Sequence, residues 1–143
     1  MTRPESLFLR AAHGAVALTG LAWAWMILFA PDTDPYSAVR HPWQPSMQSA
    51  HLLAAPLLIL AVGLIWKSHA WSRIRSGFRS RRRSGLLLAL LFLPMAASGY
   101  LLEVSVEESW RLAWRWIHLA TSLLWIGAWV LHRWPRRTEP KAA

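Results

Sequence analysis

The chain has 143 residues, enough for one domain, and no cysteine, so it cannot form disulfides, thiolate metal sites or iron–sulfur clusters of its own. Its residues are 55% hydrophobic and gather into four blocks of membrane-spanning length. The formal net charge of +9 is concentrated in one connection and at the two ends, which favours a membrane topology signal over a nucleic-acid-binding surface.

Four apolar blocks, taken in chain order, predict four membrane-spanning helices. The blocks cover about residues 6–30, 46–66, 84–102 and 110–134. The first ends before Pro31 and is too long for the apolar core of a cleavable signal peptide, and the fourth ends at Pro135. At about 1.5 Å per residue, each block crosses roughly 30 Å of hydrocarbon. The sequence therefore predicts an all-α integral membrane four-helix bundle, forming a single domain over residues 1–143.

The basic residues set the orientation of these spans. Thirteen of the 16 lie in the connection at residues 67–84 or near the two chain ends. The other connections carry the acidic residues Asp32, Asp34, Glu103, Glu107 and Glu108. Because cytoplasmic loops carry an excess of Lys and Arg, both termini and a basic loop at 67–84 are predicted to be cytoplasmic. The predicted location is the bacterial inner membrane, with several passes through the lipid.

Histidines inside the spans are the leading functional candidates, since ionisable side chains are costly there. His13 lies in the inner third of the first span and His51 in the outer third of the second. His118 and His132 lie 14 residues apart on the fourth span, about four helical turns, so they share one face and differ in depth by about 21 Å. This spacing predicts that His118 lies at the depth of His51, and His132 at the depth of His13.

Two histidines at each of two depths predict two haem sites inside the bundle. Imidazole is a common axial ligand of haem iron, and bundle cores are where such sites are built. We therefore predict two b-type haems, the outer one held by His51 and His118 and the inner one by His13 and His132. With both axial positions filled, the iron would carry electrons rather than bind a substrate, and no catalytic residue is predicted.

Arginines and small residues flank these histidines. Arg10 lies three residues before His13, Arg115 lies three before His118, and Arg111 extends the same face outward. Each is a candidate partner for a haem propionate, although Arg111 and Arg115 are equally explained as residues that snorkel to the interface. Small side chains continue the histidine stripes at Ala17, Gly20, Ala54 and Ala55. They leave room for a flat macrocycle or, equally, allow close helix packing.

His69 offers an alternative to His13. It lies 18 residues after His51, about five helical turns, and so on the same face. It could replace His13 as the partner of His132, or carry protons at a quinone site, because histidine titrates near neutral pH. We favour His13 as the ligand, since His69 should lie beyond the hydrocarbon.

A histidine in each of the first two spans, none in the third and a pair 14 residues apart in the fourth resembles the bacterial four-helix dihaem cytochrome b family. That family includes the membrane subunits of respiratory formate dehydrogenases, nickel–iron hydrogenases and thiosulfate reductases, and stand-alone quinone-reactive cytochromes. The resemblance covers roughly residues 6–134. It is carried by the four histidines, Leu93, Pro94, Gly99 and the segment 116–134.

The resemblance implies an electron carrier in which quinone reacts near the inner haem and an iron–sulfur or cytochrome subunit docks at the outer face. The chain departs from the family in its short outer loops and in Gly14, which follows His13 where stand-alone members have an aromatic residue. Two alternatives stay open. One is a self-contained oxidoreductase that links quinone to a small external redox molecule. The other is a haem-free membrane anchor or assembly protein whose histidines only pack the bundle.

Overall fold

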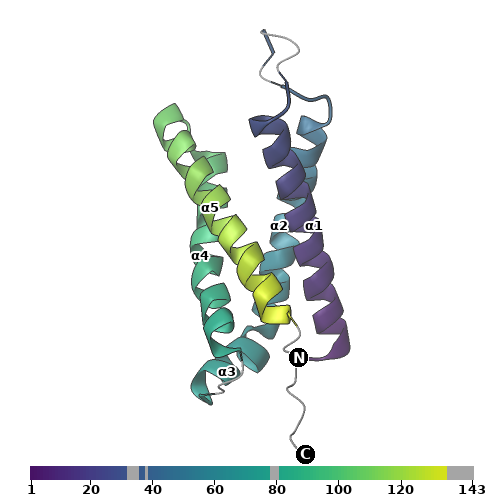
Figure 1. Cartoon of the computed structure of the whole chain (residues 1–143), viewed down its shortest axis with the longest axis vertical. Coiled ribbons are helices and arrows are strands. Elements are labelled where there is room, and N and C mark those ends of the chain that lie inside the picture. Colours follow the sequence, from purple (N-terminus) through teal and green to yellow (C-terminus); the bar gives the residue numbers. More distant parts are fainter. Residues whose placement is uncertain (32–35, 38, 78–80, 135–143) are drawn as a thin grey trace, which may run out of the picture. The chain divides into compact units, whose positions relative to one another are not determined.

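The computed structural model describes residues 1–31, 36–37, 39–77 and 81–134, so Asp32, Asp34, Pro135 and part of the basic connection lie outside the described residues. The described residues contain helices and no strand, which confirms the all-α class. The elements are α1 (Arg3–Leu28), α2 (Gln44–Ile65), the π-helix η1 (Trp66–Trp71), α3 (Ser72–Arg75), α4 (Arg82–Val104) and α5 (Glu108–Arg133). They form two compact units, Met1–Ser76 and Gly77–Ala143, which we call the first and second hairpin (Figure 1).

Three helical stretches have the length and apolar composition needed to cross a membrane, which is consistent with a multi-pass membrane protein. They are Arg3–Leu28, Gln44–Arg75 and Arg82–Val104. Helix α5 has 26 residues, as many as α1. Its histidines, arginines and tryptophans make it less apolar than the other three, so its role as a fourth span remains a prediction. Large apolar side chains such as Leu18, Leu53 and Leu90 are exposed on the three apolar helices, as expected of helices that face lipid.

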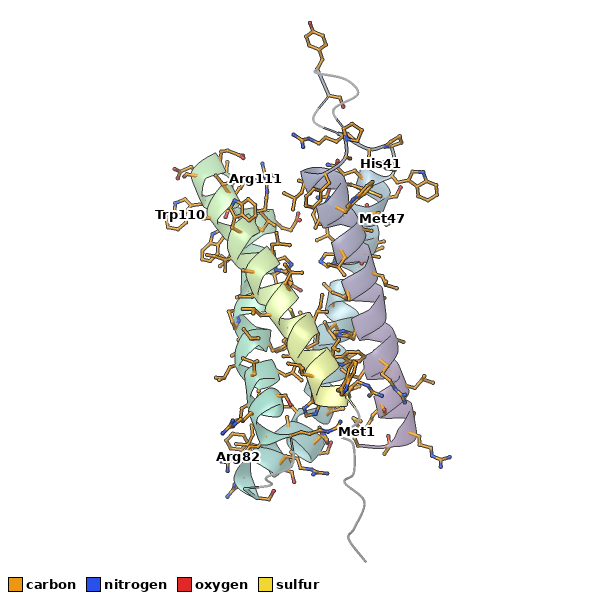
Figure 2. The ribbon with its side chains drawn as sticks, in the orientation of Figure 1. Met1, His41, Met47, Arg82, Trp110 and Arg111 are labelled. Atoms are coloured by element: carbon orange, nitrogen blue, oxygen red, sulfur yellow. The ribbon has the colours of Figure 1, made fainter. Side chains whose placement is uncertain are left out.

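In the first hairpin, α1 packs against α2. Helix α1 begins with a capping box, in which the Thr2 hydroxyl accepts the Glu5 N–H and the Glu5 carboxylate accepts the Thr2 N–H. At its other end, Arg40 Nη1 donates to the carbonyl oxygen of Ile27 at 3.1 Å, which places a cation at the negative end of the helix dipole. Figure 2 shows Met1 at one end of this hairpin and His41 and Met47 at the other.

The second helix continues beyond its predicted end. The sequence predicted a basic loop from residue 67, but the chain stays helical through η1 and α3 to Arg75. Lys and Arg are good helix formers, so a basic composition that marks the membrane interface does not end a helix. His69 lies within η1. Because a π-helical turn takes up more residues than an α-helical turn, His69 is rotated from the face that a straight α-helix would give it.

In the second hairpin, α4 packs against α5. Arg81, just before α4, has a left-handed backbone with φ of 56°. Its guanidinium donates to the carbonyl oxygen of His132 and, at 3.0 Å, to that of Trp134. These carbonyls at the end of α5 have no partner within their own helix, and the cation also matches the helix dipole. Arg81 therefore fastens the start of α4 to the end of α5, while Trp110 and Arg111 lie at the opposite end (Figure 2).

Candidate functional site

The imidazole of His51 on α2 lies against one segment of α1. Its Nδ1 is 3.1 Å from the carbonyl oxygen of Val16 and 3.3 Å from the hydroxyl of Thr19. A carbonyl can only accept, so Nδ1 carries the proton and donates it. The Thr19 hydroxyl donates to the carbonyl of Ala15 at 2.6 Å, and its oxygen is thus the acceptor for the ring. In the neutral imidazole, Nε2 then holds the lone pair that binds a metal.

Gly20 permits this close approach. A Cβ at this position would lie 2.8 Å from Cε1 of His51, so any larger residue would push against the ring. Trp23, one turn further along α1, covers the same imidazole at a ring-centroid distance of 6.0 Å. Gly20, which the sequence suggested as room for a macrocycle, makes room for the imidazole in this structure.

The imidazole of His118 on α5 is held in the same way by α4. Its Nδ1 is 2.9 Å from the carbonyl oxygen of Met95 and 3.3 Å from the hydroxyl of Ser98. The Ser98 hydroxyl donates to the Met95 carbonyl at 3.0 Å. A Cβ at Gly99 would lie 3.0 Å from Cε1 of His118. Nδ1 is therefore again the donor, and Nε2 holds the lone pair.

His132, four turns further along α5, meets a second serine–glycine pair on α4. Its Nδ1 is 3.0 Å from the hydroxyl of Ser84, which donates to the carbonyl of Arg81 at 3.1 Å. A Cβ at Gly85 would lie 3.5 Å from Cε1 of His132. With its own proton directed at Arg81, the serine oxygen accepts from Nδ1, so His132 shares the protonation of His51 and His118.

The other three histidines have different surroundings. His13 is buried on α1, with 5% of its surface exposed. His69 is half-buried on η1. His41, in the connection before α2, accepts the N–H of Trp43 at Nδ1 over 3.2 Å. A neutral His41 thus carries its proton on Nε2, opposite to the three histidines held by neighbouring helices.

The separation in depth between His13 and His51 is smaller than the sequence predicted. The His51 ring contacts α1 between Val16 and Gly20, three to seven residues beyond His13, which is about 5–10 Å along the helix. On α5 the corresponding interval from His118 to His132 is about 21 Å. His51 and His118 thus have equivalent surroundings within their own hairpins. The pairing of His13 with His132 rests on the sequence alone.

The three candidate arginines differ in their contacts. Arg10 Nε donates to the carbonyl of Ser6 in its own helix at 3.0 Å. Arg111 pairs with Glu108 at 3.6 Å, and both side chains are exposed, so this ion pair contributes little to stability. Arg115 is half-buried on α5, three residues before His118. All three remain predicted partners for propionates.

The described histidines are single imidazoles rather than members of a clustered metal site. In the part of the chain that the structure describes, no group of three or more His, Asp or Glu side chains could hold a metal ion. Haem iron needs only axial ligands from the protein, and single imidazoles with Nδ1 hydrogen-bonded are suited to that role. Three such imidazoles are on the described helices.

The hydroxyl residues beside these rings were missed by the sequence interpretation. Their signal is a hydroxyl residue followed by glycine inside an apolar helix. The three pairs are Thr19-Gly20, Ser84-Gly85 and Ser98-Gly99. The two pairs on α4 lie 14 residues apart, the same interval as His118 and His132 on α5. Equal intervals on two packed antiparallel helices keep both contacts in register.

Replacing Gly20 with alanine is expected to destabilise the protein by about 1–3 kcal/mol, the usual cost of overpacking. The new Cβ would displace the His51 ring from Val16. Gly14→Ala is the matched control on the same helix, because a Cβ there meets nothing within 4 Å. This control should be neutral or stabilising by about 0.5–1 kcal/mol. Unfolding of the detergent-solubilised proteins measures both, and equal stability of the two variants would contradict the described contact.

The candidate residues are thus His51 and the buried His13 in the first hairpin, and His118 and His132 in the second. His51, His118 and His132 are each held through Nδ1 by the neighbouring helix of the same hairpin. The functional assignment depends on these residues and their geometry. No protein-family model matches the sequence, and no curated protein or solved structure is significantly similar to it.

Proposed function

We propose that the chain is a membrane dihaem cytochrome b that passes electrons between a redox partner at the outer face and the quinone pool. The observation that carries this proposal is that the imidazoles of His51 and His118 make the same hydrogen bonds at Nδ1. Each lies on the second helix of its hairpin and has Nδ1 against a carbonyl and a hydroxyl of the first helix. Histidines that bind metals typically donate their other ring N–H in this way, which fixes the tautomer and orients the ring.

In this proposal α1, α2, α4 and α5 all span the inner membrane of a bacterium as a four-helix bundle, with both termini in the cytoplasm. The distribution of basic residues supports this orientation. The lower hydropathy of α5 is compatible with a span, because its histidines would face the bundle interior rather than the lipid.

The outer haem would be held by His51 and His118, and the inner haem by His132 with His13, or with His69 in its place. Bound haem would supply a one-electron carrier, held on both sides by imidazoles of these histidines. The contacts at Nδ1 hold the rings of His51, His118 and His132 in a fixed orientation. Arg10, Arg111 and Arg115 would neutralise propionates by charge-assisted hydrogen bonds.

Electrons would enter or leave at the outer end through an iron–sulfur or cytochrome subunit. Quinone would react near the inner haem, where His69 is available to transfer protons. This end of the chain also carries Lys67 and Arg73, whose charges favour contact with the anionic lipids of the cytoplasmic leaflet.

The test is the optical spectrum and haem content of the purified full-length chain. We expect a reduced-minus-oxidised spectrum of low-spin b haem and two haems per chain. A well-folded, helical preparation that lacks haem would overturn the proposal and favour a membrane anchor. Copurification of a redox subunit supports the electron-carrier role. Quinone-linked activity of the chain alone would contradict the need for a partner and support a self-contained oxidoreductase.

A further inference from the structure

We infer that Thr19 and Ser98 are equivalent positioning residues, each for the proposed haem ligand of its own hairpin, His51 and His118. The inference rests on the proposed function and deepens it, because it names side chains that act on the iron through its ligands. It starts from a contact that occurs twice, once in each hairpin.

The two contacts match atom by atom. Helix α1 carries Val16-Ala-Leu-Thr19-Gly20 and helix α4 carries Met95-Ala-Ala-Ser98-Gly99. In both, the first residue offers its carbonyl to the histidine Nδ1, at 3.1 and 2.9 Å. The fourth residue offers its hydroxyl, at 3.3 Å in each hairpin. The fifth is the glycine, where a Cβ would lie 2.8 or 3.0 Å from Cε1 of the ring.

The equivalence extends along the second helix of each hairpin. Seven and ten residues after His51 lie Leu58 and Ala61, and the same intervals after His118 lead to Trp125 and Ala128. All four of these residues are buried. The two hairpins thus share their packing layers as well as the histidine contact.

The equivalence of the two hairpins ends fourteen residues after the histidine. Fourteen residues after His118 stands His132, whereas fourteen residues after His51 stands the buried Ile65. The remaining histidine of the first hairpin, His13, lies on the opposite helix, seven residues before Gly20. Only His51 and His118 therefore occupy equivalent positions in the two hairpins, in keeping with the haem that they share in the proposed function.

The hydroxyls of Thr19 and Ser98 are expected to lower the reduction potential of the haem that these histidines would hold. An acceptor for the Nδ1 proton makes the imidazole a more basic ligand, which favours ferric over ferrous iron. Removing the hydroxyl should raise the reduction potential of that haem. The haem should stay bound, since the carbonyls of Val16 and Met95 still hold the rings.

The experiment is a potentiometric titration of the full chain carrying Thr19→Val or Ser98→Ala. Both variants should raise the potential of the same haem, the one lost from His118→Ala. The expected shift corresponds to about a tenfold change in the ratio of reduced to oxidised haem, or about 59 mV for one electron. Ser84→Ala should shift the other haem, although Ser84 and Ser98 lie on the same helix. The conservative variants Thr19→Ser and Ser98→Thr should restore the original potentials.

Thr121→Val is the matched control. The Thr121 hydroxyl lies one turn from His118 but donates to carbonyls of its own helix, those of Ile117 at 2.8 Å and His118 at 3.1 Å. Its loss should leave both potentials unchanged. The inference is overturned if Thr19→Val and Ser98→Ala shift different haems, or if neither shifts a potential while both haems are bound. A folded chain without haem instead overturns the proposed function, so haem content distinguishes the two failures.

Discussion

His118→Ala is expected to lower the haem content from two per chain to one. In the proposed function the variant would lack one of the two imidazoles that hold the outer haem, and a single remaining imidazole would not hold that haem through purification. The inner haem should persist, because His132 lies four turns away and keeps its contact with Ser84. His51→Ala should remove the same haem, although it changes the other hairpin. Haem content per chain and the amplitude of the b-haem absorbance measure the effect.

His41→Ala is the control for this pair of variants. His41 lies outside the helices and accepts a hydrogen bond at Nδ1, so its ring is not prepared as a ligand through Nε2. The His41→Ala variant should retain both haems. Circular dichroism establishes that each variant keeps its helices. A helical His118→Ala protein with two haems would contradict the assignment of His118 as a ligand.

Much of the helical framework is predictable from the sequence. The predicted spans and the observed helices agree to within a few residues at most ends, because apolar block length and proline positions determine those ends. The extension of α2 to Arg75 was not predicted. Charge marks where the lipid ends, but the helix continues as long as its residues favour it, and residues 67–75 contain neither proline nor glycine.

The contacts of the histidines were harder to predict from the sequence. The 14-residue interval on α5 is readable because both residues lie on one helix with a fixed rise. The contact of His51 with Thr19 joins two helices, so it depends on how far α1 is displaced along α2. That displacement is set by side-chain packing rather than by the position of each residue within its own span. The depths of His13 and His51 were counted from their separate span ends, and this is why their separation was overestimated.

The histidines proposed to hold the inner haem provide the second prediction with a large effect. His132→Ala is expected to remove the inner haem and to spare the outer one. His13→Ala should remove the same haem, whereas His69→Ala should retain both. His13 is buried within an apolar helix, as a haem ligand inside the bilayer should be, while His69 lies on a half-exposed π-helical turn beyond the predicted hydrocarbon. Haem content and the potential of the remaining haem identify which site is lost.

This experiment is decisive because burial and the distances along the helices favour different histidines as the inner ligand. The two histidines of α5 are about 21 Å apart along the helix, so the inner ligand of the first hairpin should lie about as far from His51. His13 lies only about 5–10 Å from the level of the His51 ring. His69 lies about 27 Å from His51 along a straight helix. Burial thus favours His13, and register favours His69. Loss of the inner haem from His69→Ala, with His13→Ala intact, would assign the ligand to His69.

The same site can be tested by adding a histidine and measuring whether haem binding is recovered. Ile65 occupies the position in the first hairpin that His132 occupies in the second. If the hairpins are equivalent halves, Ile65→His should restore the inner haem to the His13→Ala variant, because it supplies an imidazole at the position of the first hairpin that is equivalent to His132. Leu64→His is the matched control, since Leu64 is exposed on the same helix and should restore nothing. Equal recovery in both variants would show that an added imidazole, rather than its position, recruits the haem.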